Sequence, residues 1–213
     1  MNARSYIIIL LSLAVSALVL PALLFAAPPV SKAREIRDYQ GKHLDVFDRA
    51  YDNSIKGPQQ VNPDTYRLAI TGLVEIPQSV TYQEVLKLPI HERVITLHCV
   101  EGWTETLLFK GVRIKDLLNR AKVKPGAATI IFYAADGYSS SMTYKEIERL
   151  DLLLAFEING RTLDAKRGFP FQVVAESKLG YKWVKWVTRI ELSDKPYQGF
   201  WEKRGYDNQA DVK

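Results

Sequence analysis

Sulfur and imidazole side chains are scarce in this sequence of 213 residues, which contains one cysteine, Cys99, and three histidines. A single cysteine excludes an intrachain disulfide, and one cysteine with three scattered histidines matches no ligand spacing of a zinc site. The sequence also has neither a G-x-G-x-x-G nor a Walker loop, so it does not support nucleotide binding by those loops. The lone thiol is therefore either core filler or a reactive or ligating group.

Charge of one sign is nowhere concentrated. The net charge of +5 is spread over the chain without a run of five or six like charges. The one small basic cluster has no accompanying nucleic-acid motif, so we expect no nucleic-acid partner. With 47% hydrophobic residues, the chain can bury one substantial core.

The long stretch without charge lies at the N-terminus, where residues 5–27 contain no charged side chain. About 20 apolar residues span a bilayer, which predicts a membrane segment over residues 1–27. Leu24 or Phe25 would stand where a signal-peptide cleavage site requires a small residue, so an uncleaved anchor is favoured over a cleaved signal. We expect the body on the periplasmic side of the inner membrane, or free in the periplasm if cleavage occurs.

Residues 28–52 are polar and rich in turn signals, which predicts a linker. After it, short strands and short helices follow one another in an irregular order. This order indicates an α+β fold with a mixed sheet rather than a doubly wound one. The patterns predict strands at 66–70, 93–99, 129–134, 152–158, 171–175 and 183–192, and helices at 81–87, 112–121 and 144–150.

Cys99 ends the predicted strand 93–99. A lone cysteine on an apolar strand face usually packs in a core, but a strand end followed by Glu101 and a glycine can present a side chain to a cleft. A thiolate there could act as a nucleophile or bind a soft metal. His98 projects to the opposite strand face, which disfavours a Cys-His dyad, although His43 or His91 could reach the thiol from elsewhere in the fold.

Residues 180–187 interleave two lysines with aromatic residues. Such a segment can stack on a flat ring and neutralise a phosphate. It is equally typical of an edge strand whose lysines prevent aggregation.

Six short blocks carry a resemblance to a known family. Residues 53–207 resemble the molybdopterin-binding domain of the sulfite oxidase superfamily, most of all its short bacterial oxidoreductases, and residues 208–213 would be a tail. The blocks are His-Cys-Val-Glu-Gly-Trp at 98–103, Ala-Asp-Gly-Tyr at 135–138, Asn-Gly at 159–160, Gly-Phe-Pro at 168–170, Leu-Gly-Tyr-Lys-Trp-Val-Lys-Trp at 179–186 and Gly-Phe-Trp-Glu-Lys-Arg-Gly-Tyr at 199–206.

The resemblance implies an enzyme with a molybdenum-molybdopterin cofactor. It makes Cys99 the protein ligand of molybdenum and a catalytic residue, with Glu101 and Tyr138 beside the metal. The cofactor would transfer an oxygen atom to or from a small substrate such as sulfite, a sulfoxide or an N-oxide. No His-Pro-Gly-Gly haem signature occurs, which implies an external electron carrier such as a membrane haem protein. The residues implied in cofactor binding are Arg167, Trp183, Val184 and Lys185.

Two departures from the family pattern stand out. Gln172 occupies the position where an arginine follows the Gly-x-Pro-x run in the methionine sulfoxide reductase branch. No arginine pair precedes the N-terminal apolar run, as the twin-arginine export of folded cofactor proteins would require. The missing arginine pair leaves three alternatives: another export route, a body that faces the cytoplasm, or a domain that has lost its cofactor. Two other functions also stay open, a cofactor-free binding or assembly domain of the same fold and an enzyme with a cysteine nucleophile.

Overall fold

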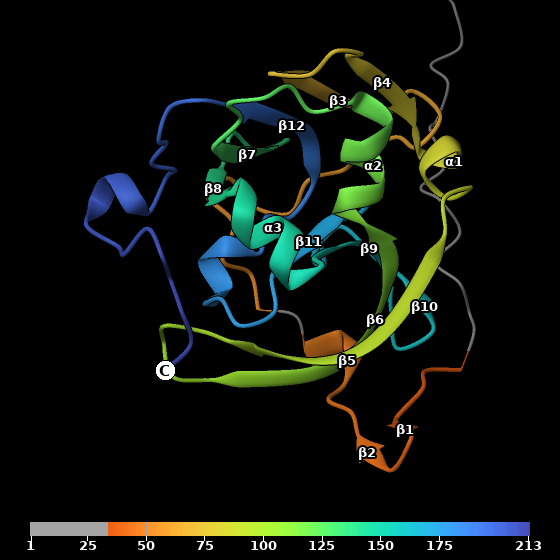
Figure 1. Ribbon diagram of the computed structural model, residues 1–213. Coiled ribbons are helices and arrows are strands. Elements are labelled where there is room, and N and C mark those ends of the chain that lie inside the picture. Colours follow the sequence, from red (N-terminus) through yellow and green to blue (C-terminus); the bar gives the residue numbers. More distant parts are fainter. Residues whose placement is uncertain (1–33, 50) are drawn as a thin grey trace, which may run out of the picture.

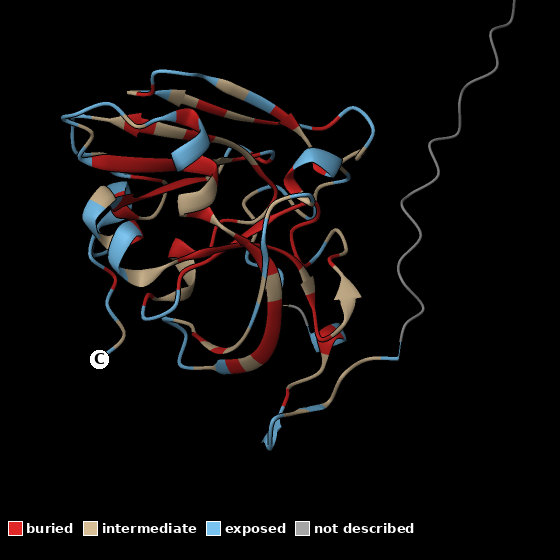
Figure 2. Ribbon diagram, turned by 45° about the vertical axis from the view of Figure 1, so that its right-hand side comes forward, coloured by how far each residue is buried: buried red, intermediate tan, exposed pale blue. Residues whose placement is uncertain are grey.

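The structure, a computed structural model, describes residues 34–49 and 51–213. Two five-stranded sheets and three short α-helices surround one continuous hydrophobic core (Figure 1). Buried positions follow the strands and exposed positions follow the loops and the outer sides of the helices (Figure 2). This arrangement confirms the predicted α+β fold with mixed sheets.

One sheet has the order β10-β9-β6-β5, and β11 pairs with β9. All of its pairings are antiparallel. The longest of them joins β5 and β6, which form the extended ribbon in the lower part of Figure 1. The strands are β5 (Ile90–His98), β6 (Thr104–Arg113), β9 (Leu153–Ile158), β10 (Arg161–Thr162) and β11 (Gln172–Val174).

The other sheet has the order β4-β3-β12-β7-β8. Its β12–β3 pair is parallel and its other pairs are antiparallel, which makes this the mixed sheet. The strands are β3 (Arg67–Gly72), β4 (Gln78–Thr81), β7 (Thr129–Ala134), β8 (Ser139–Thr143) and β12 (Val187–Ser193). A separate small hairpin joins β1 (Asp38–Tyr39) and β2 (Lys42–His43).

The helices are α1 (Tyr82–Val85), α2 (Ile114–Ala121) and α3 (Tyr144–Leu150). Both α1 and α3 begin with a capping box, in which a threonine and a glutamate three residues later satisfy backbone N–H groups reciprocally. Short 3-10 helices occur at Phe47–Arg49, Gly180–Lys182 and Glu202–Arg204. Among the described residues, no helix is long and apolar enough to cross a membrane. The predicted membrane segment at residues 1–27 lies outside the described range.

Asn159 and Gly160 form the predicted tight turn between β9 and β10, with φ values of 52° and 76°. The Asn159 side chain is fully buried. Its Oδ1 accepts a hydrogen bond from the Leu108 N–H at 2.9 Å, and its Nδ2 donates to the Asp45 carbonyl at 2.8 Å. The turn therefore ties the segment around residue 45 to the sheet.

Strands β4, β6 and β8 were not predicted, and one predicted strand begins later than expected. No strand was predicted over β6, because its apolar residues do not alternate and the polar Glu105 stands among them; the strand is central and buried on both sides. The predicted strand 183–192 begins only at Val187. Residues 180–186 instead make a 3-10 turn and irregular backbone, with Trp186 at a φ of 50°. This irregular backbone aims side chains of the segment at a cavity.

Candidate active site

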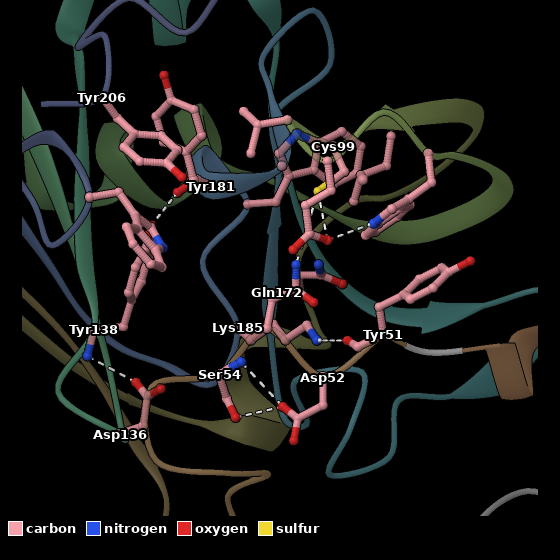
Figure 3. Close-up of a pocket in the computed structure, with 18 of the residues that line it drawn as sticks. Tyr51, Asp52, Ser54, Cys99, Asp136, Tyr138, Gln172, Tyr181, Lys185 and Tyr206 are labelled. Atoms are coloured by element: carbon pink, nitrogen blue, oxygen red, sulfur yellow. Dashed lines mark hydrogen bonds between the residues drawn. The ribbon is translucent and has the colours of Figure 1, made fainter. Parts of the chain in front are cut away.

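A cavity of about 340 Å³ lies beside the end of β5 (Figure 3). Segments distant in sequence meet there: the loop 51–54, the β5–β6 connection, the β7–β8 turn, the start of β11 and the segment 180–186. The charged and sulfur-bearing side chains among the lining residues are Asp52, Cys99, Glu101, Asp136 and Lys185.

Cys99 follows the last residue of β5 and is only partly buried. Its N–H donates to the Trp103 carbonyl at 3.0 Å, and its carbonyl accepts from Gly102 N–H at 3.1 Å. Gly102 has a φ of 85°, which a glycine adopts without strain, so the chain turns sharply here. Burial raises the pKa of the Cys99 thiol, which favours the protonated form when no metal or cation stabilises the thiolate.

Glu101 and Trp103 form the rim of the cavity next to the thiol. Glu101 Oε2 accepts a hydrogen bond from Trp103 Nε1 at 2.9 Å and lies 3.7 Å from Cys99 Sγ. The Trp103 ring stacks on Tyr51, with ring centroids 4.0 Å apart and an interplanar angle of 22°. Asn53 Nδ2 lies 4.0 Å from the sulfur. The rim is thus held by contacts to the loop 51–54.

Lys185 is the cation among the lining residues. Its ammonium donates to the Tyr51 carbonyl at 3.1 Å, and no carboxylate of the described residues lies within ion-pair distance. Burial, and next the positive charge of Arg167, lower the Lys185 pKa from 10.5 to about 8. An anionic ligand in the cavity would relieve this destabilisation of the charged form.

Tyr138 and Asp136 line the side of the cavity formed by the β7–β8 turn. The Tyr138 hydroxyl donates to the Tyr181 carbonyl at 2.6 Å, and burial raises its pKa. The buried Asp136 carboxylate accepts from the N–H groups of Tyr138 at 2.9 Å and Ile55 at 3.3 Å. Asp136 therefore holds the turn in place, while Tyr138 presents a protonated phenol.

Arg167 does not line the cavity. Its guanidinium makes two 2.7 Å bonds to the Glu105 carboxylate and donates to the Phe47 carbonyl. Lys182 is also committed, because its ammonium lies 2.6 Å from Glu202 in a pair with 0% exposed side chains. Both of these nearby cations are neutralised inside the protein.

The cavity collects most of the side chains that the sequence indicates. Cys99, Glu101, Tyr138, Trp183 and Lys185 line it. Val184, like Arg167, does not line it; Val184 is buried, and its carbonyl accepts the Val173 N–H at 2.8 Å.

Other lining residues had no site signal in the sequence. Residues 51 and 52 belong to the predicted linker, and the segment 52–54 reads only as a turn. Trp201 and Tyr206 occur in the last family block without an assigned role. Gln172, noted as a departure from the family pattern, also lines the cavity (Figure 3).

The C-terminal residues pack against the cavity wall. The Leu179 N–H donates to the Ala210 carbonyl at 2.8 Å, and the Val212 N–H donates to the Ser177 carbonyl at 2.9 Å. The buried Lys178 ammonium contacts Asp211 at 2.7 Å. Residues 208–213, predicted as a tail, therefore brace the segment that precedes Lys185.

The oxidoreductase molybdopterin-binding domain family model matches residues 55–201. The uncharacterized oxidoreductase YuiH of Bacillus subtilis is 31% identical over 147 residues, which cover 68% of this chain and 74% of YuiH. The protein-methionine-sulfoxide reductase catalytic subunit MsrP of Ralstonia nicotianae is 30% identical over 157 residues, covering 66% of this chain and 47% of MsrP.

Among solved structures, the sulfane dehydrogenase SoxCD of Paracoccus pantotrophus superposes with a TM-score of 0.62 at 28% identity. The match covers 65% of this chain and 41% of the SoxCD chain. The chain thus spans about three quarters of YuiH but less than half of MsrP and of the SoxCD chain.

Proposed function

The chain belongs to the oxidoreductase molybdopterin-binding domain family within the sulfite oxidase superfamily, and we propose that it transfers an oxygen atom to or from a small sulfur substrate. Family membership identifies it as an enzyme whose cofactor is molybdenum-molybdopterin. The observation that carries the proposal is a single cavity that holds both a soft sulfur donor, Cys99, and an unpaired ammonium, Lys185. N-oxides belong to the same reaction class and are further candidate substrates.

The lining residues fit a molybdenum cofactor that carries a phosphate. Molybdenum accepts soft thiolate ligands, and the Cys99 sulfur faces the cavity. Burial lowers the pKa of Lys185, and its ammonium forms no ion pair with a carboxylate of the described residues; a phosphate in the cavity would supply that partner. When bound, the cofactor supplies the two-electron chemistry of oxygen-atom transfer.

We assign the protein residues as follows. Cys99 is the metal ligand, and Lys185 pairs with the phosphate of the cofactor. Trp183 forms cavity wall, and Val184 contributes through the backbone of the same irregular segment. Arg167 influences cofactor binding indirectly. Its guanidinium is bound to Glu105, and its positive charge lowers the pKa of Lys185.

Glu101 and Tyr138 act beside the sulfur. Glu101 Oε2 is 3.7 Å from Cys99 Sγ and is fixed by the Trp103 indole, so it orients the ligand loop and faces incoming substrate. Tyr138 holds its proton because burial raises its pKa, and its hydroxyl is anchored on the Tyr181 carbonyl. Its one hydroxyl hydrogen is donated to that carbonyl, so Tyr138 holds the segment around Tyr181 at the cavity and is not suited to act as a base.

A separate carrier, such as a membrane haem protein, supplies the electrons. We place residues 53–207 on the periplasmic side of the inner membrane, with residues 1–27 as anchor and 28–52 as linker. The charge-free run at residues 5–27 supports this placement.

Molybdenum content tests the assignment. The full chain is purified from a host that makes the cofactor, and molybdenum per chain is measured for the wild type, Cys99→Ser and the control Ile76→Ser, whose side chain is exposed and does not line the cavity. We expect stoichiometric metal in the wild type and the control and loss of metal in Cys99→Ser. A folded wild type without metal would refute the enzyme assignment, and undiminished metal in Cys99→Ser would refute the ligand role.

A further inference from the structure

The charged side chains that line the cavity are mostly acidic. Asp52, Glu101 and Asp136 carry carboxylates, and Lys185 is the cation. A hydrogen bond from Ser54 lowers the pKa of Asp52, so this carboxyl is ionised at neutral pH. Once Lys185 pairs with the cofactor phosphate, no cation of the lining residues is left for the substrate.

Arg167 and Lys182 lie nearby, but neither cation can take the place of Lys185 in the cavity without breaking a buried ion pair. Arg167 and Glu105 have side chains 7% and 3% exposed and are joined at 2.7 Å. Lys182 and Glu202 are joined at 2.6 Å with both side chains fully buried. Separating either pair would leave a buried carboxylate without a partner, which is strongly unfavourable. The cavity thus lacks the free arginine that recognises an oxyanion by paired hydrogen bonds.

Much of the rest of the lining is aromatic. Ring faces and edges are apolar surfaces that accommodate alkyl groups, and their quadrupole attracts alkylated cations. Glu101 stands at the exposed rim, next to Trp103 and close to the sulfur, where a substrate enters. The rings at the cavity are those of Tyr51, Trp103, Tyr138, Tyr181, Trp183, Trp186, Trp201 and Tyr206.

We propose that the cavity selects substrates by charge, admitting uncharged or cationic alkyl-substituted oxides and rejecting oxyanions such as sulfite, and that Glu101 is the residue that sets this preference. The inference rests on the proposed function only in calling the admitted molecules substrates. The charge of the cavity is a property of the chain itself. Reduction of such an oxide, for instance a dialkyl sulfoxide, breaks the sulfur–oxygen bond, consumes two electrons from the external carrier and two protons, and yields the dialkyl sulfide and water.

The Cys99 thiol, which lines the cavity, can report the charge of the cavity. The full chain is prepared without cofactor, and Cys99 is labelled with three methanethiosulfonate reagents that carry a trimethylammonium group, no charge or a sulfonate. All three react with the same thiolate, so the ratio of their rates is independent of the pKa of Cys99. Low ionic strength keeps the carboxylates unscreened.

We expect the cationic reagent to react fastest and the anionic reagent slowest. One unit charge about 4 Å away in water changes a rate about fivefold, and the two charged reagents respond in opposite directions. Glu101→Gln should therefore lower the cationic-to-anionic rate ratio by about 25-fold, because the two fivefold changes multiply, and Asp52→Asn should lower it less. The control is Glu75→Gln, an exposed glutamate outside the cavity, which should leave the ratio unchanged.

Equal rates for the charged reagents, a faster anionic reagent or an unchanged ratio in Glu101→Gln would overturn the proposal. Failure of the neutral reagent to react would overturn it too, because the cavity would then not admit a molecule of this size. The rate ratio needs no molybdenum. A preserved ratio in a chain that never binds metal would therefore refute the proposed function and leave the charge selection standing.

Discussion

Replacing Lys185 by methionine should raise the stability of the protein prepared without cofactor. The same substitution should abolish cofactor binding. The lysine pKa falls from 10.5 to about 8, chiefly because the ammonium is buried. At about 1.4 kcal/mol for each tenfold change in acidity, this fall corresponds to about 3 kcal/mol of destabilisation at neutral pH. The side chain is partly exposed and donates one hydrogen bond to Tyr51, so we expect a net gain of about 1–2 kcal/mol for Lys185→Met.

The pH dependence separates this cause from packing. Below about pH 8 Lys185 is charged in the folded and unfolded states, and the burial penalty is fully present. Between about pH 8 and 10.5 the folded state loses the proton first, so the wild type gains stability as the pH rises. The stability advantage of Lys185→Met should therefore shrink between pH 7 and pH 9.5.

Urea unfolding of the cofactor-free full chain at both pH values measures this difference. Lys166→Met is the matched control, because Lys166 is exposed and its loss removes the same formal charge. In protein from a cofactor-producing host, Lys185→Met should contain much less molybdenum than Lys166→Met. An advantage of Lys185→Met that is the same at pH 7 and pH 9.5 would refute a buried, uncompensated ammonium.

Three further predictions concern the frame of the site and are measured by urea unfolding. Arg167→Met should lower the free energy of unfolding by about 3–5 kcal/mol, because it leaves the Glu105 carboxylate buried without a partner. Adding Glu105→Leu should recover most of this loss, and no recovery would contradict the reasoning. Gly111→Ala should cost more than about 2 kcal/mol, because a Cβ there would lie 2.4 Å from the Leu154 carbonyl oxygen, so an unchanged stability would contradict the close β6–β9 approach. Thr143→Ala should cost about 1 kcal/mol through loss of the α3 capping box, whereas Thr143→Ser should cost little.

Local sequence patterns determined several elements of the fold. The Thr-x-x-Glu pair that begins α1 was visible because a capping box depends on residues three apart. The Asn159–Gly160 turn was visible because both positions require positive φ. The run before Cys99 predicted a strand end, and the blocks around Cys99 and Lys185 predicted the cofactor. Each of these signals lies within a few residues of chain.

The tertiary structure decided which charges are free to act. Arg167 and Lys185 look equivalent in the sequence, but Glu105, 62 residues before Arg167, neutralises the first and leaves the second in the cavity. Tyr51 reaches Trp103 and Lys185 from a segment that composition marks only as linker. β6 is a central strand because β5 and β9 pair with its two edges. Burial and ion pairing depend on residues that folding brings together from distant parts of the chain. The sequence therefore determined which reactive and charged side chains are present, and the tertiary structure determined which of them face the cavity.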